Sequence, residues 1–187
     1  MTSQTSLRGD PPHWSPTDML GLRDDDETES DESDPQAYLI FELGRQRLAV
    51  TVAQVREILD DLEVTPLPKA PMDVEGMIDL RGHGVCVVDL RGRLGIPPAE
   101  SRAAHRIVVF EFTRPGAAPL PIGVRTDAVR DVCLISPEAI EAKPESLQDW
   151  DGALIDGVTR LDEKIVVLVN LGAVFETGNA AGMFDFP

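Results

Sequence analysis

The sequence predicts an all-β domain with a few short helical turns, and two observations carry that prediction. About ten short segments are rich in β-branched and aromatic residues, and turn signals separate them at regular intervals. No amphipathic helix of 10–15 residues alternates with these segments, which argues against a doubly wound α/β fold. A sandwich or barrel of antiparallel character is therefore expected.

Each predicted strand is a short apolar or alternating run bounded by glycine, proline or polar residues. The strands are expected at residues 38–43, 48–52, 55–59, 77–80, 85–88, 105–112, 120–125, 128–135, 154–161 and 164–169. Residues 44–47 and 81–84 are expected to form turns, and Ser136-Pro137 to open a helical turn. Asn170 is expected to cap a short helix over residues 170–175.

The charge of the chain is concentrated at its beginning. The 187 residues carry a net charge of −16, and residues 1–35 hold ten acidic side chains against Arg8 and Arg23. Such a segment cannot bury enough apolar surface to order itself, so it is predicted to be disordered. A short docking peptide is the alternative, formed by the cluster His13, Trp14, Met19, Leu20 and Leu22. Residues 36–177 are predicted to form one domain and 178–187 a flexible tail. Nucleic acid is not an expected partner, because no basic cluster is present.

Compartment and membrane signals point to a cytoplasmic protein. No charged and then apolar leader of the secretory type is visible, and the longest aliphatic run, 165–169, is too short to cross a bilayer. Membrane insertion is therefore not expected. The two cysteines, Cys86 and Cys133, do not suggest a disulfide framework.

The sequence contains few patterns that are typical of metal-binding or catalytic sites. His83-x-x-Cys86, with His105 and Cys133 as remote ligands, is the one candidate metal site, but residues i and i+3 of a strand point to opposite faces. No G-x-S-x-G elbow or glycine-rich phosphate loop occurs. The protein is therefore expected to bind partners without metal, cofactor or catalysis, and a metal-dependent module remains the alternative.

Residues 76–95, GMIDLRGHGVCVVDLRGRLG, contain DLRG twice and resemble the signature of the CheW-like family of bacterial chemotaxis coupling proteins. The resemblance extends to 52–58, to the prolines before the signature, to 122–132 and to 161–174, so it covers about residues 36–177. Asp79 stands where the family usually has Asn, Cys86 where it often has Pro, and Gly84 replaces a common aliphatic residue.

The resemblance implies a fold and a role. The fold would be two five-stranded, SH3-like β-barrels packed side by side. The role would be a non-catalytic adaptor that joins the cytoplasmic tips of chemoreceptors to the regulatory domain of a CheA-type histidine kinase, within membrane-associated receptor arrays. A related chemosensory pathway that controls surface motility or gene expression is the alternative within the same fold.

The resemblance also implies a receptor-binding face. Arg81 of the first DLRG copy would lie on that face, held by a bidentate ion pair with Glu57 and flanked by Val55 and Gly76. An ordinary surface ion pair is the alternative, and the kinase-binding residues are not assigned.

The second DLRG copy is expected to have a structural role. Asp89 would close a strand and cap a short helix, with Leu90 and Leu94 facing inward. Arg91 and Arg93 would then form a solvated helix face, with a second basic patch as the alternative. No supersecondary unit repeats around the two copies, so they are expected to do different jobs.

Overall fold

The computed structural model describes residues 34–97, 105–114, 116, 118–144 and 152–177. The predicted tail 178–187 and all but the last two residues of the predicted acidic segment 1–35 lie outside this part. The strands are β1 (Gln36–Leu43), β2 (Gln46–Thr51), β3 (Val55–Asp60), β4 (Val74–Leu80), β5 (His83–Val88), β6 (Arg106–Phe112), β7 (Leu120–Thr126), β8 (Ala128–Ile135), β9 (Ile155–Leu161) and β10 (Lys164–Val169). Short helices η1 (Val52–Gln54), η2 (Pro137–Ala139), η4 (Gly152–Leu154) and α2 (Leu171–Thr177) accompany them.

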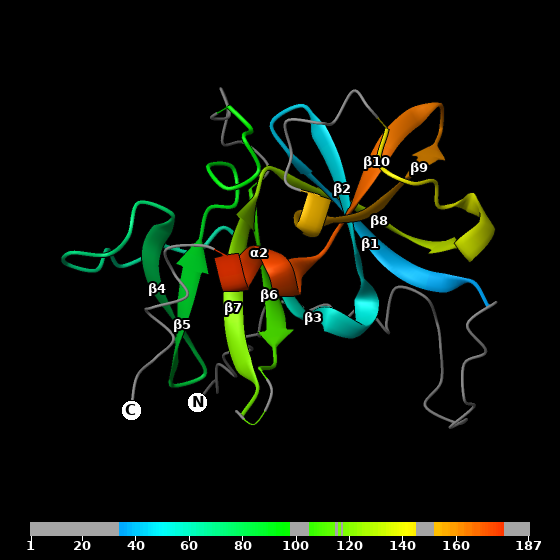
Figure 1. Ribbon diagram of the computed structural model, residues 1–187. Helices are drawn as coiled ribbons and strands as arrows, with labels where there is room; N and C mark the ends of the chain where they lie inside the picture. Colours follow the sequence, from blue (N-terminus) through cyan, green and yellow to red (C-terminus); the bar gives the residue numbers. More distant parts are fainter. Residues whose placement is uncertain (1–33, 98–104, 115, 117, 145–151, 178–187) are drawn as a thin grey trace, which may run out of the picture.

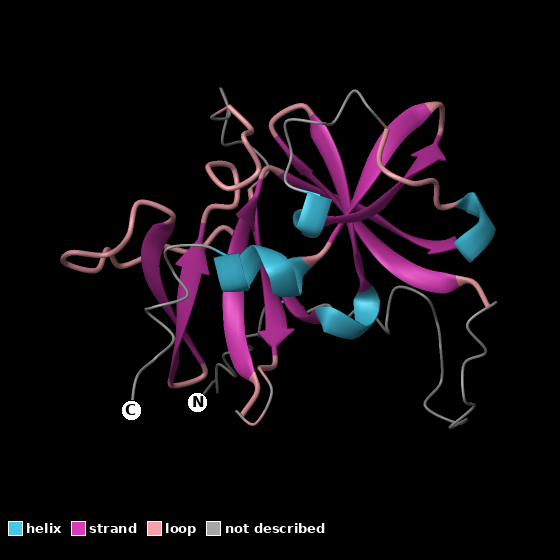
Figure 2. Ribbon diagram, in the orientation of Figure 1, coloured by secondary structure: helices cyan, strands magenta, loops and turns pink. Residues whose placement is uncertain are grey.

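The ten strands form two five-stranded sheets that lie side by side (Figures 1 and 2). One sheet, ordered β3-β6-β7-β5-β4, uses consecutive strands and is called the continuous subdomain here. The other, ordered β8-β1-β2-β10-β9, combines both ends of the chain and is called the split subdomain. The predicted all-β class and pair of SH3-like subdomains are confirmed, although each sheet is open and not a closed barrel.

The two sheets share one topology. Strands β3 to β7 in chain order occupy the same sheet positions as β8, β9, β10, β1 and β2. Each sheet contains one parallel pair, β5 with β7 and β10 with β2, and the other pairings are antiparallel. The split subdomain is thus a circularly permuted version of the continuous one.

This repeat is also visible in the sequence, at an offset of 81 residues rather than ten. Val88-Asp89-Leu90 after β5 matches Val169-Asn170-Leu171 after β10. The first DLRG copy therefore spans the end of β4 and its turn, while the second follows β5. The two copies occupy different positions of one sheet and are not repeats of each other, while the β4–β5 unit around them recurs as β9–β10.

Successive side chains along a strand point to opposite faces of its sheet, and the buried ones form three apolar clusters. Leu39 and Phe41 of β1 face a central core between the subdomains, while Tyr38 and Ile40 face the interior of the split subdomain. In β6, Phe110 faces the central core, while Ile107 and Val109 line the interior of the continuous subdomain. Both faces of each sheet are thus buried, which explains the nearly continuous apolar runs in the sequence.

Helix α2 joins the subdomains. It lies in front of β6 and β7 in Figure 1, and Phe175 packs edge-on against Phe112 with ring centroids 5.5 Å apart. The predicted cap is present, since Asn170 Oδ1 accepts a hydrogen bond from Ala173 N at 2.9 Å. Within the described residues, no helix combines the length and apolar character needed to cross a membrane.

Candidate functional site

The hairpin between β4 and β5 turns at Arg81-Gly82, within the predicted turn at residues 81–84. Arg81 (φ 55°) and Gly82 (φ 83°) both adopt the left-handed conformation, which matches the twist of a two-residue hairpin loop. Asp79 Oδ1 accepts a hydrogen bond from Gly82 N at 2.7 Å and closes the turn. A carboxylate accepts this bond as an asparagine carbonyl would, so the Asp79 departure leaves the turn intact.

This turn brings Arg81 to Glu57 of β3, at the opposite edge of the sheet. Arg81 Nη2 lies 3.3 Å from Glu57 Oε2, and this contact between elements at opposite edges shows that the sheet curls. The pair makes one nitrogen–oxygen contact, so the expectation of a bidentate pair was wrong. The Glu57 side chain is 10% exposed and that of Arg81 is 67% exposed. A buried carboxylate therefore anchors an exposed guanidinium.

A hollow of about 370 Å³ surrounds this pair, and its walls include Arg56, Glu57, Leu80, Arg81, His83 and Pro121. Water screens this pair from the side of the exposed Arg81, so its contribution to stability is small, about 0–1 kcal/mol. The consequence of the Glu57 contact is therefore orientation of the guanidinium rather than stabilisation of the fold.

Val55 and Gly76 lie outside the walls of this hollow. Val55 is buried in the central core, where β3 pairs with β6. Gly76 lies on β4 against the β3–β4 connection, and an added Cβ would stand 2.1 Å from the Thr65 carbonyl oxygen. The structure thus brings Glu57 and Arg81 together and leaves the other two predicted residues in packing positions.

The arginines of the second DLRG region are buried, so the expectation of a solvated helix face was wrong. Arg93 donates from Nε to Asp73 Oδ2 at 2.7 Å and from Nη1 to the carbonyl of Val174 in α2. Arg91 lies between Asp89 and Asp127. These side chains are withdrawn from solvent because their partners come from other parts of the chain.

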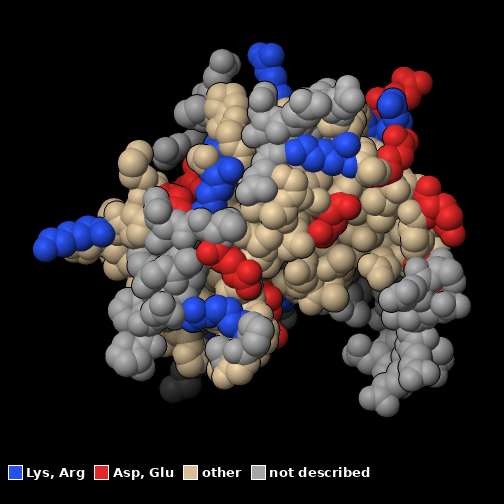
Figure 3. All heavy atoms as spheres, viewed as in Figure 1, with Lys and Arg blue, Asp and Glu red and all other residues tan. Residues whose placement is uncertain are grey.

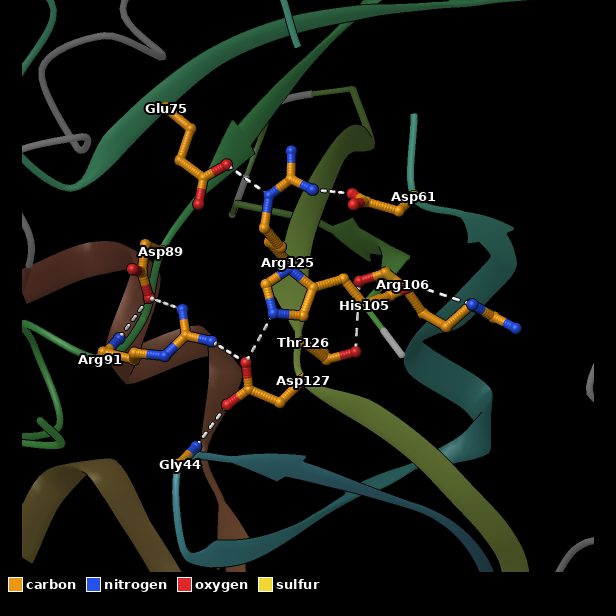
Figure 4. A network of polar contacts seen from close by, with 10 residues as sticks. All are labelled: Gly44, Asp61, Glu75, Asp89, Arg91, His105, Arg106, Arg125, Thr126 and Asp127. Carbon is orange, nitrogen blue, oxygen red and sulfur yellow. Dashed lines mark hydrogen bonds and ion pairs between the residues drawn. The ribbon is translucent and has the colours of Figure 1, made fainter. Parts of the chain in front are cut away.

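Asp127 connects the two subdomains (Figure 4). It follows β7, its side chain is 14% exposed, and its Oδ2 accepts a hydrogen bond from Gly44 N of the split subdomain at 2.5 Å. Its Oδ1 contacts the Arg91 guanidinium and lies 3.1 Å from His105 Nε2, both in the continuous subdomain. Sequence reasoning missed this residue, because its partners come from distant segments.

Asp89 accepts a hydrogen bond from Arg91 N at 2.9 Å, the geometry of a cap. The following residues form consecutive turns over 91–95 instead of the predicted helix, with Leu94 N bonded to the Leu90 carbonyl at 3.0 Å. Leu90 and Leu94 are both buried in the central core. The inward orientation predicted for these leucines is confirmed.

Replacing Asp89 with alanine is expected to lower the free energy of unfolding by about 0.5–2 kcal/mol, through loss of the bond to Arg91 N. Urea denaturation followed by circular dichroism measures this change. An unchanged midpoint would contradict the capping role of Asp89.

Cys86 and His83 differ in their surroundings. Among the described residues, no group of three or more His, Cys, Asp or Glu side chains is arranged to hold a metal ion. His83 is exposed, while Cys86 is half-buried. Burial, together with the nearby charge of Asp73, raises the pKa of the Cys86 thiol to about 11.

A raised thiol pKa predicts slow alkylation of Cys86. At pH 8 its thiolate fraction is on the order of 0.001, against roughly 0.2 for an ordinary cysteine. In a Cys133→Ser variant, iodoacetamide should therefore react about a hundredfold more slowly with the native protein than with the urea-unfolded protein, and faster as pH rises towards 11. Equal rates would show that the thiol is not shielded.

Charge on the visible face of the molecule is dispersed. Figure 3 shows basic side chains in separate places on that face, with acidic side chains among them and no continuous basic patch. A positive patch is the usual requirement for nucleic-acid binding. The described residues visible on this face do not form such a patch.

Comparison with known proteins decides the family. A model of the CheW-like domain matches residues 37–178. The chain belongs to the CheW-like family. The CheW chemotaxis protein of Rhizobium meliloti is 33% identical over 137 residues, which cover 73% of this chain and 85% of that protein. The chemotaxis protein CheW of Thermotoga maritima is 27% identical over 138 residues, covering 74% and 86%.

A solved structure agrees with this assignment. The crystal structure of the scaffolding protein TtCheW from Thermoanaerobacter tengcongensis superimposes with a TM-score of 0.69 at 26% identity, covering 83% of this chain and 96% of that one. As a CheW-like protein, the chain is a chemotaxis scaffold or adaptor and not an enzyme.

Proposed function

We propose that this CheW-like chain couples the cytoplasmic tips of chemoreceptors to the regulatory domain of a CheA-type histidine kinase. Its family supports a scaffolding role. The observation that carries the receptor half is the exposed Arg81 guanidinium anchored on buried Glu57. In this proposal the protein acts in the cytoplasm and is recruited to membrane-associated receptor arrays.

Arg81 is suited to recognition because it is exposed and oriented at the same time. Its backbone is fixed in a two-residue turn, and one of its nitrogens contacts Glu57. A guanidinium carries five N–H donors in a rigid fork, and holding it in place before binding reduces the entropy lost in the complex. A carboxylate or carbonyl group on the receptor tip is the complementary acceptor. The kinase is proposed to bind elsewhere, at residues that we do not assign.

Replacing Arg81 with alanine is expected to weaken binding of a chemoreceptor-tip fragment about tenfold, which corresponds to ~1.4 kcal/mol. Affinity for the kinase regulatory domain should change less than twofold, because that partner is proposed to bind a different surface. Isothermal titration of the full chain with each partner measures both effects.

The matched control is Arg45→Ala, which removes an exposed arginine from the β1–β2 turn of the split subdomain. An Arg81→Lys variant keeps the charge but loses the fork, and intermediate affinity is expected. Equal receptor affinities for Arg81→Ala and Arg45→Ala would refute the assignment of Arg81 to the receptor face.

A further inference from the structure

A second hollow, of about 750 Å³, lies in the continuous subdomain and shares no wall residue with the hollow around Arg81. The β3–β4 connection forms one side of it with Asp61, Leu62, Glu63, Val64 and Pro66. Glu75, Asp89, Arg91, His105 and Arg125 form the rest. Its volume falls within the range typical of small-ligand sites, about 300–1,000 Å³.

The cationic side chains of this cleft are already matched by carboxylates (Figure 4). Arg125 lies between Asp61 and Glu75, with Nε 2.6 Å from Glu75 Oε2. Arg91 lies between Asp89 and Asp127, with Nη1 2.9 Å from Asp89 Oδ1. Each guanidinium thus contacts two carboxylates, so the arginines do not offer a site for an anion.

The cleft as a whole has a formal excess of negative charge. Its walls carry the carboxylates of Asp61, Glu63, Glu75 and Asp89 against two guanidiniums, with exposed Glu63 at the rim. Four carboxylates against two guanidiniums leave two uncompensated negative charges. A cationic ligand is therefore favoured and an anionic one is repelled.

His105 supplies a buried acceptor at this cleft. The residue is 4% exposed, it lines the cleft, and its Nδ1 has no hydrogen-bond partner in the described part of the chain. Its Nε2 lies 3.1 Å from Asp127 Oδ1, close but not aligned for a good hydrogen bond. We assign the ring proton to Nε2 because that nitrogen faces a carboxylate, which leaves the buried Nδ1 lone pair without a donor among the described residues.

The remaining wall is apolar. Leu62, Val64 and Pro66 follow one another along the β3–β4 connection, and Leu62 is an exposed large apolar side chain. Aliphatic surface of this kind packs against a methylene stem, as the stem of a lysine does on a protein surface. The cleft therefore combines negative charge, a buried acceptor and an apolar strip.

We propose that this cleft binds a primary ammonium group carried on an aliphatic stem. The ammonium would donate a hydrogen bond towards His105 Nδ1 and neutralise part of the excess charge beside Glu63, while its stem packs on Leu62 and Pro66. The group is either a free aliphatic amine or the lysine side chain of a partner. This inference stands apart from the receptor-to-kinase role.

Nuclear magnetic resonance of the His105 imidazole in the full chain tests the proposal. Titration with 1,5-diaminopentane or with the peptide acetyl-Gly-Lys-Gly-amide should shift the His105 resonances saturably, and neutral 1,5-pentanediol should not. Saturation by the peptide alone would identify a partner lysine as the source, and saturation by the diamine would identify a free amine. No saturable shift with either probe, or an equal shift with pentanediol, would overturn the proposal.

Matched variants separate specific binding from general attraction. Glu63→Gln removes a rim charge of the cleft and should weaken binding at least threefold. Glu138→Gln makes the same change at an exposed position of η2 in the split subdomain and should leave affinity unchanged. Equal effects of these two variants would also overturn the proposal. His105→Phe should abolish the ammonium preference, with its folding checked by circular dichroism.

Discussion

Replacing Asp127 with alanine is expected to lower the free energy of unfolding by about 3 kcal/mol. The side chain contacts Gly44 N, Arg91 and His105, so its loss removes a link between the two subdomains. Removing one partner of a buried pair costs roughly 3–5 kcal/mol, and the lower end applies because Asp89 still contacts Arg91. Urea denaturation followed by circular dichroism measures the loss.

Two further variants sharpen this test. Asp127→Asn keeps the shape and the acceptor for Gly44 N but removes the charge, so an intermediate loss is expected. Glu111→Ala removes an exposed carboxylate from β6 and should change stability by less than about 0.5 kcal/mol. A loss for Asp127→Ala as small as that of Glu111→Ala would show that Asp127 does not hold the subdomains together.

Replacing Gly76 with alanine is expected to cost at least about 3 kcal/mol. Gly76 has φ 148°, and an added Cβ would stand 2.1 Å from the Thr65 carbonyl oxygen. This oxygen belongs to backbone that pairs with β4, since Thr65 N and Met77 N exchange hydrogen bonds of 2.8 and 2.9 Å with the facing carbonyls. The clash therefore cannot be relieved by rotating a side chain, and the β3–β4 connection must move.

The control for this variant is Gly92→Ala, where an added Cβ meets nothing within 4 Å. Its stability should change by less than about 0.5 kcal/mol. Gly157, the counterpart of Gly76 in the split subdomain, also lies close to backbone, 2.9 Å from the Glu141 carbonyl oxygen. Thermal denaturation of the three alanine variants should rank Gly76 as most damaging and Gly92 as least. Equal midpoints for Gly76→Ala and Gly92→Ala would contradict the close approach.

The strands could be predicted from the sequence because their signal is local. Runs such as residues 106–112 combine β-branched and aromatic residues, and burial on both faces of each sheet keeps these runs apolar. The conformation of the hairpin turn was harder to predict. The turn was expected within residues 81–84, but the positive φ of Arg81 has no local signal, because an arginine with positive φ is uncommon.

The burial of Arg91 and Arg93 could not be predicted, because it depends on distant partners. Asp127 is 36 residues from Arg91, and Asp73 is 20 residues from Arg93. From the local sequence, an arginine is expected to be exposed. Its burial requires carboxylate partners, which come close to it only in the folded protein. By contrast, the 81-residue repeat that relates Asp89 to Asn170 was readable in the sequence and was obscured by the closer DLRG pair.

The Glu57–Arg81 contact was predictable in part. The family resemblance predicted that the two residues form an ion pair. The structure shows that this pair is one contact between a buried glutamate and an exposed arginine. Val55 and Gly76 were grouped with this pair, yet their positions in the core and against Thr65 explain them by packing. Substitutions at those two residues are therefore expected to act through the fold.

The coupling role is tested most directly by asking whether the chain bridges its two proposed partners. A chemoreceptor-tip fragment is immobilised, and retention of a CheA-type regulatory domain is measured as the full chain is added, with Arg81→Ala and Arg45→Ala in parallel. The account predicts that retention requires the chain, falls strongly with Arg81→Ala and is unchanged with Arg45→Ala. Retention that is independent of the chain, or no retention at any concentration of it, would contradict the coupling role.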